Sequence, residues 1–236
     1  MRNNYNCEIP PYVREDVISI QEAQQRAGWE ITAFNLPSAW QHTMGEGVRI
    51  AVIDTGCDLD HPDLVANLLP GKNFVNPARE PDDDAGHGSI CAGIICAENN
   101  DIGVVGVAPK CRVVPIKALK KNGTGDLRIV AAATEWAANQ GVDFIVMSLG
   151  SPNKVAVIER AIQYASRKGV VVICAAGNAG RTREIFYPAA YKETIGVGAI
   201  DMNMNRAKFS CTGDDLNFLA PGVQILSTVP DNWYAV

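Results

Sequence analysis

Three polar side chains stand where apolar segments of the sequence end or begin. Asp54 follows the run VRIAVI, Asn178 follows the run GVVVICAAG, and His87 lies between glycines in AGHGS. An imidazole can act as a general base when a carboxylate orients it, and a side-chain amide can donate a hydrogen bond to a developing oxyanion. These residue types could therefore catalyse acyl transfer if the fold brings them together.

Each of the three residues also has a structural alternative. Asp54 could cap the turn that follows through Thr55 and Gly56. His87 could be a structural histidine, and Asn178 could occupy the left-handed conformation that asparagine tolerates in turns. No single residue decides between the two interpretations.

The elements that must position these residues alternate along the chain. Continuous β-branched runs predict buried strands at 48–53, 111–119, 143–149, 169–177, 193–200 and 223–228. Helical patterns lie at 86–99, 126–140 and 154–169, with Asp126 as an N-cap and Gly169 as a C-terminal signal. Alternation of this kind predicts an α/β fold with three layers, a mostly parallel sheet with helices on both faces. The carboxyl ends of its strands should meet at one rim, where sites gather.

The first 30 residues differ from the rest. They are polar, and Pro10 and Pro11 exclude a regular helix there, although QEAQQRA could form a short one. We expect an N-terminal extension over 1–30 and one domain over 31–236. The acidic run EPDDDAG (80–86) is expected to be an exposed loop.

Composition narrows the class of protein. The chain has 236 residues, of which 47% are apolar and 20% charged, and its formal net charge is −5. This charge disfavours a nucleic-acid partner, and no apolar run approaches the roughly 18 residues that span a membrane. The seven cysteines are an odd number, contain no CxxC pair and lie partly in apolar runs, as expected of free thiols in a reducing compartment. With no apolar leader segment at the N-terminus, we expect a cytoplasmic protein.

Several segments together resemble one family of enzymes. The segments VIDTGCDLDHPDL, GHGSICAGI, KNGTGD, MSLGS, AAGNAG, FLAPGVQILST and PDNWY follow in the order and approximate spacing of the subtilisin family of serine proteases. The resemblance covers about residues 31–236, and the polar N-terminal extension is most like that of the intracellular subtilisins. It implies a subtilisin-like fold and a serine-type endopeptidase that works by an Asp-His-Ser triad.

The resemblance assigns roles to individual residues. Asp54 is then the triad aspartate, His87 the general base, and Asn178 the side-chain donor of the oxyanion hole. Two rims would bind an extended peptide or protein substrate, and they consist of Gly123, Thr124, Gly125, Ser148, Leu149 and Gly150. The small residues Ala175, Ala176 and Gly177 would leave room for a sizeable side chain before the scissile bond. Members of the intracellular group are often dimers, so a homodimer is a further expectation.

The resemblance also implies a calcium site. The segment CAENNDIGVVGVAP (96–109) is similar to the cation-binding loop of the family, in which carbonyl and amide oxygens are ligands. The candidate ligands are Gln25, Asp63, Asn100, Ile102 and Val104. The alternative is a polar loop without a metal.

The sequence departs from the family pattern in two places. Ser89 and Ile90 follow the histidine motif where a threonine and a second histidine are usual. The Gly-Thr-Ser-Met-Ala motif that carries the nucleophile should begin just beyond Val236, and none of the serines present has that context. We therefore expect a piece of a longer enzyme, with its C-terminal part missing, which is inactive and unstable alone. The alternative is a non-catalytic peptide-binding pseudoprotease.

A cluster of carboxylates is also compatible with a different class of function. The carboxylates of Asp54, Asp58, Asp60 and Asp63 could serve a metal-dependent hydrolase or phosphatase. That hypothesis predicts no role for His87 and leaves most of the motifs unexplained.

The N-terminal extension carries one further pattern. The residues Glu8-Ile9-Pro10-Pro11-Tyr12 resemble an Ile-Pro-Tyr-like motif that crosses the active site in intracellular subtilisins. This resemblance leads to the hypothesis that residues 1 to about 25 inhibit the enzyme in cis.

Overall fold

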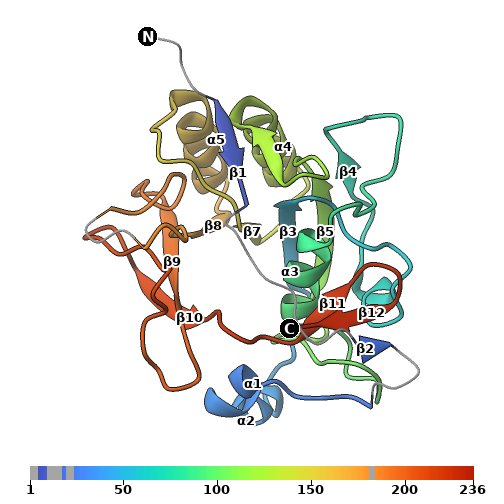
Figure 1. Ribbon diagram of the computed structural model, residues 1–236. Coiled ribbons are helices and arrows are strands. Elements are labelled where there is room, and N and C mark those ends of the chain that lie inside the picture. The colour runs from blue at the N-terminus through green and yellow to red at the C-terminus, as the bar shows by residue number, and fades with distance from the viewer. Residues whose placement is uncertain (1–4, 10–17, 20–23, 181–183) are drawn as a thin grey trace.

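A seven-stranded parallel sheet forms the centre of the molecule (Figure 1). The computed structural model describes residues 5–9, 18–19, 24–180 and 184–236. The sheet has the order β10-β9-β8-β7-β3-β5-β4, and every neighbouring pair is parallel. Its strands are β3 (Arg49–Asp54), β4 (Lys72–Asn73), β5 (Arg112–Lys117), β7 (Phe144–Met147), β8 (Val171–Ala175), β9 (Thr194–Ile200) and β10 (Phe218–Pro221). The chain first adds strands on one side of β3 and then on the other, so a topological switch point lies at the end of β3.

Helices cover both faces of this sheet. Successive residues of β3 point to opposite sides: Ala51 and Ile53 pack in the core with α4 (Leu127–Asn139) and α5 (Ala156–Arg167), whereas Val52 packs with α3 (His87–Cys96). Figure 1 shows α3 in front of β3 and β5, away from α4 and α5. The predicted three-layer α/β fold is confirmed.

One predicted strand was wrong. Residues 223–226 are not a strand, because Gln224 takes a left-handed conformation with φ of 54° that ends any extended run. The chain instead forms β11 (Ser227–Val229) and β12 (Trp233–Ala235), which join β2 (Ile18–Ser19) in a small antiparallel sheet. The edge of the main sheet is β10, a strand that no apolar alternation had indicated.

The small sheet also holds helix α3. The hydroxyl of Ser227 donates a hydrogen bond to the Ile90 carbonyl, and the hydroxyl of Thr228 donates one to the Ser89 carbonyl, both at 2.8 Å. These bonds join β11 to the first turns of α3 across more than 130 residues of sequence.

The described part of the N-terminal segment is bonded to the domain. Strand β1 (Asn6–Glu8) pairs with β6 (Thr124–Asp126). The expected helix in QEAQQRA is not seen in its described part, since Gln24 and Arg26 form β-bridges with Ile102 and Val104. The described residues also form two short helices, α1 (Trp29–Ala33) and α2 (Leu36–Trp40), and a 3₁₀ turn, η2 (Val65–Asn67). Among the described residues no helix is long and apolar enough to cross a membrane.

Candidate active site

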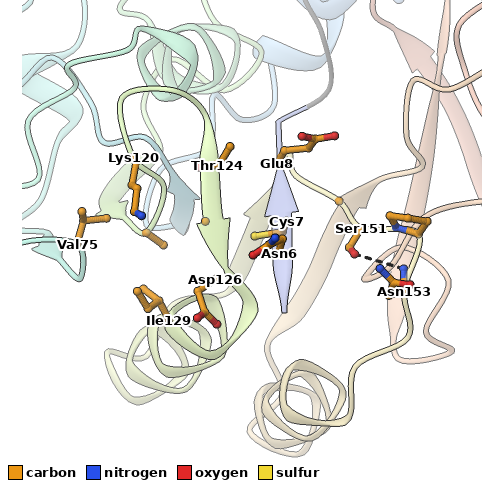
Figure 2. Close-up of a pocket in the computed structure, with 14 residues that line it drawn as sticks. Asn6, Cys7, Glu8, Val75, Lys120, Thr124, Asp126, Ile129, Ser151 and Asn153 are labelled. Atoms are coloured by element: carbon orange, nitrogen blue, oxygen red, sulfur yellow. Dashed lines mark hydrogen bonds between the residues drawn. The ribbon is translucent and has the colours of Figure 1, made fainter. Parts of the chain in front are cut away.

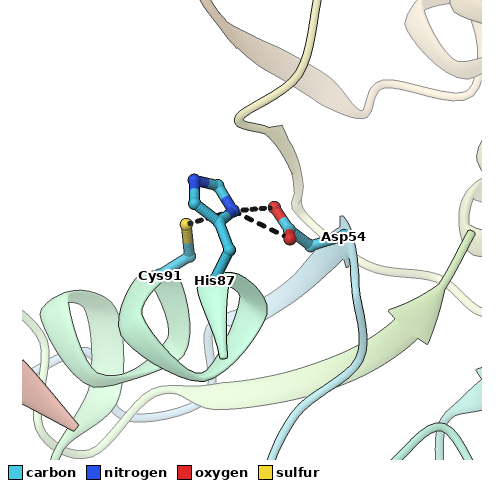
Figure 3. A group of neighbouring side chains, drawn as sticks. All are labelled: Asp54, His87 and Cys91. Atoms are coloured by element: carbon cyan, nitrogen blue, oxygen red, sulfur yellow. Dashed lines mark hydrogen bonds and ion pairs between the residues drawn. The ribbon is translucent and has the colours of Figure 1, made fainter. Parts of the chain in front are cut away.

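The carboxylate of Asp54 and the imidazole of His87 form a hydrogen-bonded pair (Figure 3). Nδ1 of His87 lies 2.8 Å from Oδ1 and 3.0 Å from Oδ2 of Asp54. The carboxylate can only accept, so Nδ1 carries the proton and Nε2 of the neutral ring is the acceptor nitrogen. That tautomer is the one a general base needs.

The environment of this pair controls its charge. Asp54 is fully buried, and its Oδ1 also accepts a 2.7 Å hydrogen bond from the Thr55 amide. Burial of the imidazole acts to lower the pKa of His87, but the Asp54 carboxylate and the Cys91 thiol together outweigh burial and raise this pKa well above its ordinary value. The pair is therefore built to stabilise an imidazolium.

A glycine lets the helix approach β3 closely enough for this contact. A Cβ atom added to Gly88 would lie 2.0 Å from the Gly56 carbonyl oxygen, which no side chain can tolerate. The Gly88 amide donates a 2.9 Å hydrogen bond to the hydroxyl of Thr55. The glycines around His87 thus place α3 directly against the loop that follows Asp54.

A second buried carboxylate, missed from the sequence, fixes the start of α3. Asp83 lies within the acidic run that was predicted to be exposed, yet it is buried and accepts hydrogen bonds from the amides of Ala85, Gly86 and Ser89 and from the Ser89 hydroxyl. Burial acts against these bonds, but together they lower the pKa of Asp83. The expectation of an exposed loop was wrong for this residue, because a carboxylate surrounded by amide donors is stable inside.

Lys117, also missed, ties two loops of the site together. It lies buried at the end of β5, beside Asp54 in the sheet register. Its Nζ donates to the Thr55 carbonyl and lies 2.5 Å from a carboxylate oxygen of Asp84. In the sequence, Lys117 lies within an apolar run that predicts a strand, and nothing else there indicated that it contacts the site.

The thiol of Cys91 also contacts the pair and was not singled out from the sequence. Its sulfur lies 3.9 Å from Nδ1 of His87 and donates to the Ser148 hydroxyl at 3.4 Å. Because Cys91 faces the nitrogen that Asp54 already holds, His87 cannot activate this thiol through Nε2. Four-residue spacing on α3 was the available signal, since it puts Cys91 and His87 on one helix face.

His87 and Asn178 line one cavity of about 350 Å³ at the carboxyl ends of β7 and β8. The predicted residues Ser148, Ala175 and Gly177 line it as well. The structure thus brings together the imidazole, the amide and the small residues that the sequence analysis placed at this rim.

The two predicted substrate rims lie on either side of β1. Glu8 exchanges two main-chain hydrogen bonds with Gly150, at 3.1 and 2.9 Å, and the Ile9 amide donates to the Gly123 carbonyl at 3.0 Å. A cavity of about 660 Å³ follows this strand, and Figure 2 shows β1 between Thr124 and Ser151. Leu149 contributes to the core beneath the rim. The described extension thus occupies the groove between the two rims as a middle strand.

Comparison with known proteins identifies the family. The model of the subtilase family, Peptidase_S8, matches residues 45–235. The chain belongs to the subtilase family. It is 44% identical over 207 residues to an intracellular serine protease of Paenibacillus polymyxa, covering 84% of this chain and 64% of that protein. It is 42% identical over 212 residues to Subtilisin Savinase of Lederbergia lenta, covering 89% and 77%.

A third relative is named the major intracellular serine protease of Bacillus subtilis, 36% identical over 242 residues, with 98% of this chain and 75% of the relative covered. The sequence of this subtilase spans 64% of the Paenibacillus relative and 58% of an alkaline protease of Alkalihalobacillus alcalophilus. These matches confirm the predicted resemblance to the subtilisin family.

The predicted calcium ligands of this subtilase lie in one place. Asp63 is buried, and its two carboxylate oxygens accept from the Asn100 amide at 2.8 Å and the Val104 amide at 3.0 Å. The side chain of Gln25 lies 2.8 Å from the Glu98 carbonyl and 3.4 Å from the Val104 carbonyl. Ile102 bridges to Gln24, next to Gln25.

These donors fit a hard cation. The carboxylate of Asp63 and the side-chain amides of Gln25 and Asn100 can each offer an oxygen. Two main-chain carbonyl oxygens, of Glu98 and Val104, already converge on Nε2 of Gln25. No lysine, arginine or histidine among the described residues forms an ion pair with Asp63, and burial raises the pKa of its carboxyl group. A buried carboxylate without a cationic partner is a site that a divalent ion stabilises.

The phosphatase hypothesis has no support in the arrangement of its four carboxylates. Within the described ranges, Asp54, His87 and Cys91 are the one group of three such side chains whose ligand atoms lie within 4.8 Å of one another. Asp58 accepts hydrogen bonds from the Asp60 and Asp231 amides, and Asp63 accepts from Asn100 and Val104 of the loop described above. The predicted absence of a role for His87 also disagrees with its contact with Asp54.

Proposed function

We propose that this subtilase chain carries the general base and the substrate-binding cleft of a serine endopeptidase. The observation that carries the proposal is the 2.8 Å contact between buried Asp54 and Nδ1 of His87 at the rim where Asn178 lines the same cavity. A carboxylate, a base in the correct tautomer and an amide donor are the parts that acyl transfer needs around a nucleophilic hydroxyl.

The chemistry follows from the placement of these groups. A serine hydroxyl at Nε2 of His87 gives its proton to the imidazole as its oxygen bonds to the peptide carbonyl carbon. Asp54 stabilises the imidazolium, and the Asn178 amide donates to the carbonyl oxygen as it becomes an oxyanion. His87 then gives the proton to the amine nitrogen as the carbon–nitrogen bond breaks. Water repeats the sequence to release the acyl group.

The nucleophile is proposed to come from chain beyond Val236. The 350 Å³ cavity beside His87 is lined by small residues such as Gly177, Gly198 and Gly222, which leave space for a helix end. The neighbouring edge strand exposes Phe218 and Leu219, which further chain could cover.

The test is a serine-directed label on a protein extended past Val236. A fluorophosphonate should modify one serine of the extended protein, and His87→Ala should abolish the modification with folding unchanged by circular dichroism. The matched control is His42→Ala, an exposed histidine outside the site. A soluble, folded protein that ends at Val236 and binds peptides without modification would favour the pseudoprotease instead.

The N-terminal extension is proposed to inhibit this enzyme in cis. Its strand β1 supplies the main-chain hydrogen bonds that an extended substrate would make with Gly123 and Gly150. Pro10, Pro11 and Tyr12 of the proposed motif lie outside the described residues. Deleting residues 1–23 from the extended protein spares Gln25 and should raise the rate on a peptide substrate; an unchanged rate would rule out inhibition.

Calcium is the proposed structural ion of the loop that contains Asn100. Asp63, Asn100 and Gln25 would hold it through side-chain oxygens, and Ile102 and Val104 through carbonyls. Bound there, the ion supplies positive charge beside a buried carboxylate and ties the segment at Gln25 to the loop. We also propose that the enzyme acts in the cytoplasm, since two relatives are named intracellular proteases. The homodimer stays a prediction.

A further inference from the structure

The cleft holds more of the extension than the three residues of β1. The Leu127 amide donates a 2.8 Å hydrogen bond to the Tyr5 carbonyl, one residue before the strand begins. Because side chains alternate along a strand, Tyr5 and Cys7 point to the side opposite that of Asn6 and Glu8. Ile9 continues the row of Tyr5 and Cys7, and all three pack against the core.

The middle residue of this row fills a small pocket. Cys7 is 2% exposed and packs in the core cluster with Leu119 and Leu127. A Cβ atom added to Gly125 would lie 2.4 Å from the Leu119 side chain and 3.3 Å from the Cys7 sulfur. The pocket is therefore closed around a side chain of about this size.

The first residue of the row, Tyr5, contacts a cation as well as the core. The guanidinium carbon of Arg128 lies 4.8 Å from the centre of the Tyr5 ring. A guanidinium plane over an aromatic face attracts the ring through its quadrupole.

The guanidinium of Arg128 is also held by contacts that do not involve Tyr5. Nε of Arg128 lies 3.0 Å from both carboxylate oxygens of Asp126, and its terminal nitrogen also contacts Asp126. Asp126 is itself fixed as the N-cap of α4, where Oδ1 accepts from the Arg128 amide at 2.8 Å. A side chain fixed in this way loses little conformational entropy on binding.

We propose that Arg128, held by Asp126, is a binding subsite for an aromatic side chain of the peptide substrate, two residues before the one that fills the Cys7 pocket. The inference rests on the proposed function of the cleft. The substrate class is a peptide with the pattern aromatic, any residue, small apolar, any residue, aliphatic. The first residue of that pattern binds Arg128 as Tyr5 does.

The test uses the full chain and two acetylated, amidated peptides, Tyr-Asn-Ala-Glu-Ile and Ala-Asn-Ala-Glu-Ile. The amides of Glu8 and Ile9 are hydrogen-bonded to Gly150 and Gly123 and exchange when β1 leaves the cleft. A peptide that binds the vacated cleft keeps β1 out and therefore speeds hydrogen exchange at these two amides. We expect the tyrosine peptide to reach half its effect at roughly two- to fivefold lower concentration, as an exposed cation–π contact implies.

Variants assign the difference to the guanidinium. Arg128→Ala should remove most of the advantage of the tyrosine peptide, and Arg160→Ala, which removes an exposed arginine from α5, should keep it. Without peptide, Tyr5→Ala should speed exchange at least roughly two- to fivefold, whereas Tyr5→Phe should not. In the Arg128→Ala background the Tyr5→Ala change should have a smaller effect, since only the packing of the ring against the core is then lost.

The two possible failures can be told apart. Equal effects of the two peptides, or an advantage that is undiminished in Arg128→Ala, would overturn the aromatic subsite and leave the peptide cleft standing. If neither peptide changes exchange at millimolar concentration, the cleft does not bind peptides and the proposed function fails with the subsite.

Discussion

At the scale of single residues, the contact between Asp54 and His87 sets how the site responds to pH. The buried ring alone would have a lowered pKa, but the Asp54 carboxylate raises the pKa of His87 well above 6.5. The base is then protonated over a wider pH range. The rate of catalysis should therefore rise as the pH rises through the raised pKa of His87. The stability that the folded protein gains from the charged pair is fully present below pH 6.5, the ordinary pKa of histidine, and is lost as the pH rises through the raised pKa.

Asp54→Asn should separate these two effects in the extended protein. The amide cannot stabilise the imidazolium, so we expect the pKa of His87 to fall and kcat to fall by about 10⁴ through loss of the correct tautomer. Proton NMR of the histidine ring measures the pKa, and peptide hydrolysis measures the rate. A His87 that titrates unchanged in the variant would mean that Asp54 does not control its charge.

Asn178→Ala tests the oxyanion donor at the same scale. The amide is expected to act on the transition state rather than on bound substrate, so kcat should fall by about 10²–10³ while KM stays nearly constant. This range of loss in kcat was established for the oxyanion donor of a subtilisin, and we expect it here because the chain belongs to the same family. A change in KM alone, measured with the same peptide, would place Asn178 in substrate binding instead.

Much of this residue-level picture could be predicted and part could not. Asp54 and Asn178 follow apolar strands, a position that sequence shows directly. Asp83, Lys117 and Cys91 gave no such signal, because their roles depend on which loops meet in space. An acidic run looks solvated until the amides of Gly86 and Ser89 are known to surround one of its members.

At the scale of elements, the packing of α3 against the loop after β3 depends on Gly88, because a glycine has no Cβ atom. Gly88→Ala would press a methyl group onto the Gly56 carbonyl oxygen, which belongs to the backbone and cannot turn away. We expect a loss of about 1–3 kcal/mol in the free energy of unfolding and a marked loss of activity, since His87 moves with the helix.

Denaturant unfolding of Gly88→Ala and of a control, Ser166→Ala at an exposed position of α5, measures this cost. The control should change stability by less than about 0.5 kcal/mol. Equal stability of the two variants would show that α3 can shift away from β3 without cost.

Element prediction succeeded where one physical signal was strong. The buried strands β3, β5, β7, β8 and β9 were recognisable from β-branched runs, and α4 and α5 from their periodicity and end signals. The strand predicted at 223–228 was wrong over its first four residues, because Gln224 takes a left-handed conformation that interrupts the run VQILST. Strands β1 and β6 escaped prediction because their pairing partners lie more than 100 residues apart.

At the scale of the whole molecule, calcium should add to the stability of the fold. At about 100 times its Kd, an ion that binds only the folded chain adds about 2.7 kcal/mol. For a domain of this size that corresponds to roughly 5–10 °C in Tm. Chelation with EDTA should lower Tm by this amount in a calorimeter.

Asp63→Asn should remove the response to calcium, because the variant lacks the charge that attracts the ion. Asp201→Asn, at a turn far along the chain, is the control and should keep the response. An identical Tm with calcium and with EDTA would contradict the proposed site.

The two hydroxyl groups of β11 that bind α3, those of Ser227 and Thr228, are made late in the synthesis of the chain. The nascent polypeptide contains His87 long before the ribosome reaches Thr228, 139 residues after Ser89. Until then the helix that carries the base lacks these two anchors. The ribosome therefore completes all seven strands of the main sheet before α3 gains these anchors from β11.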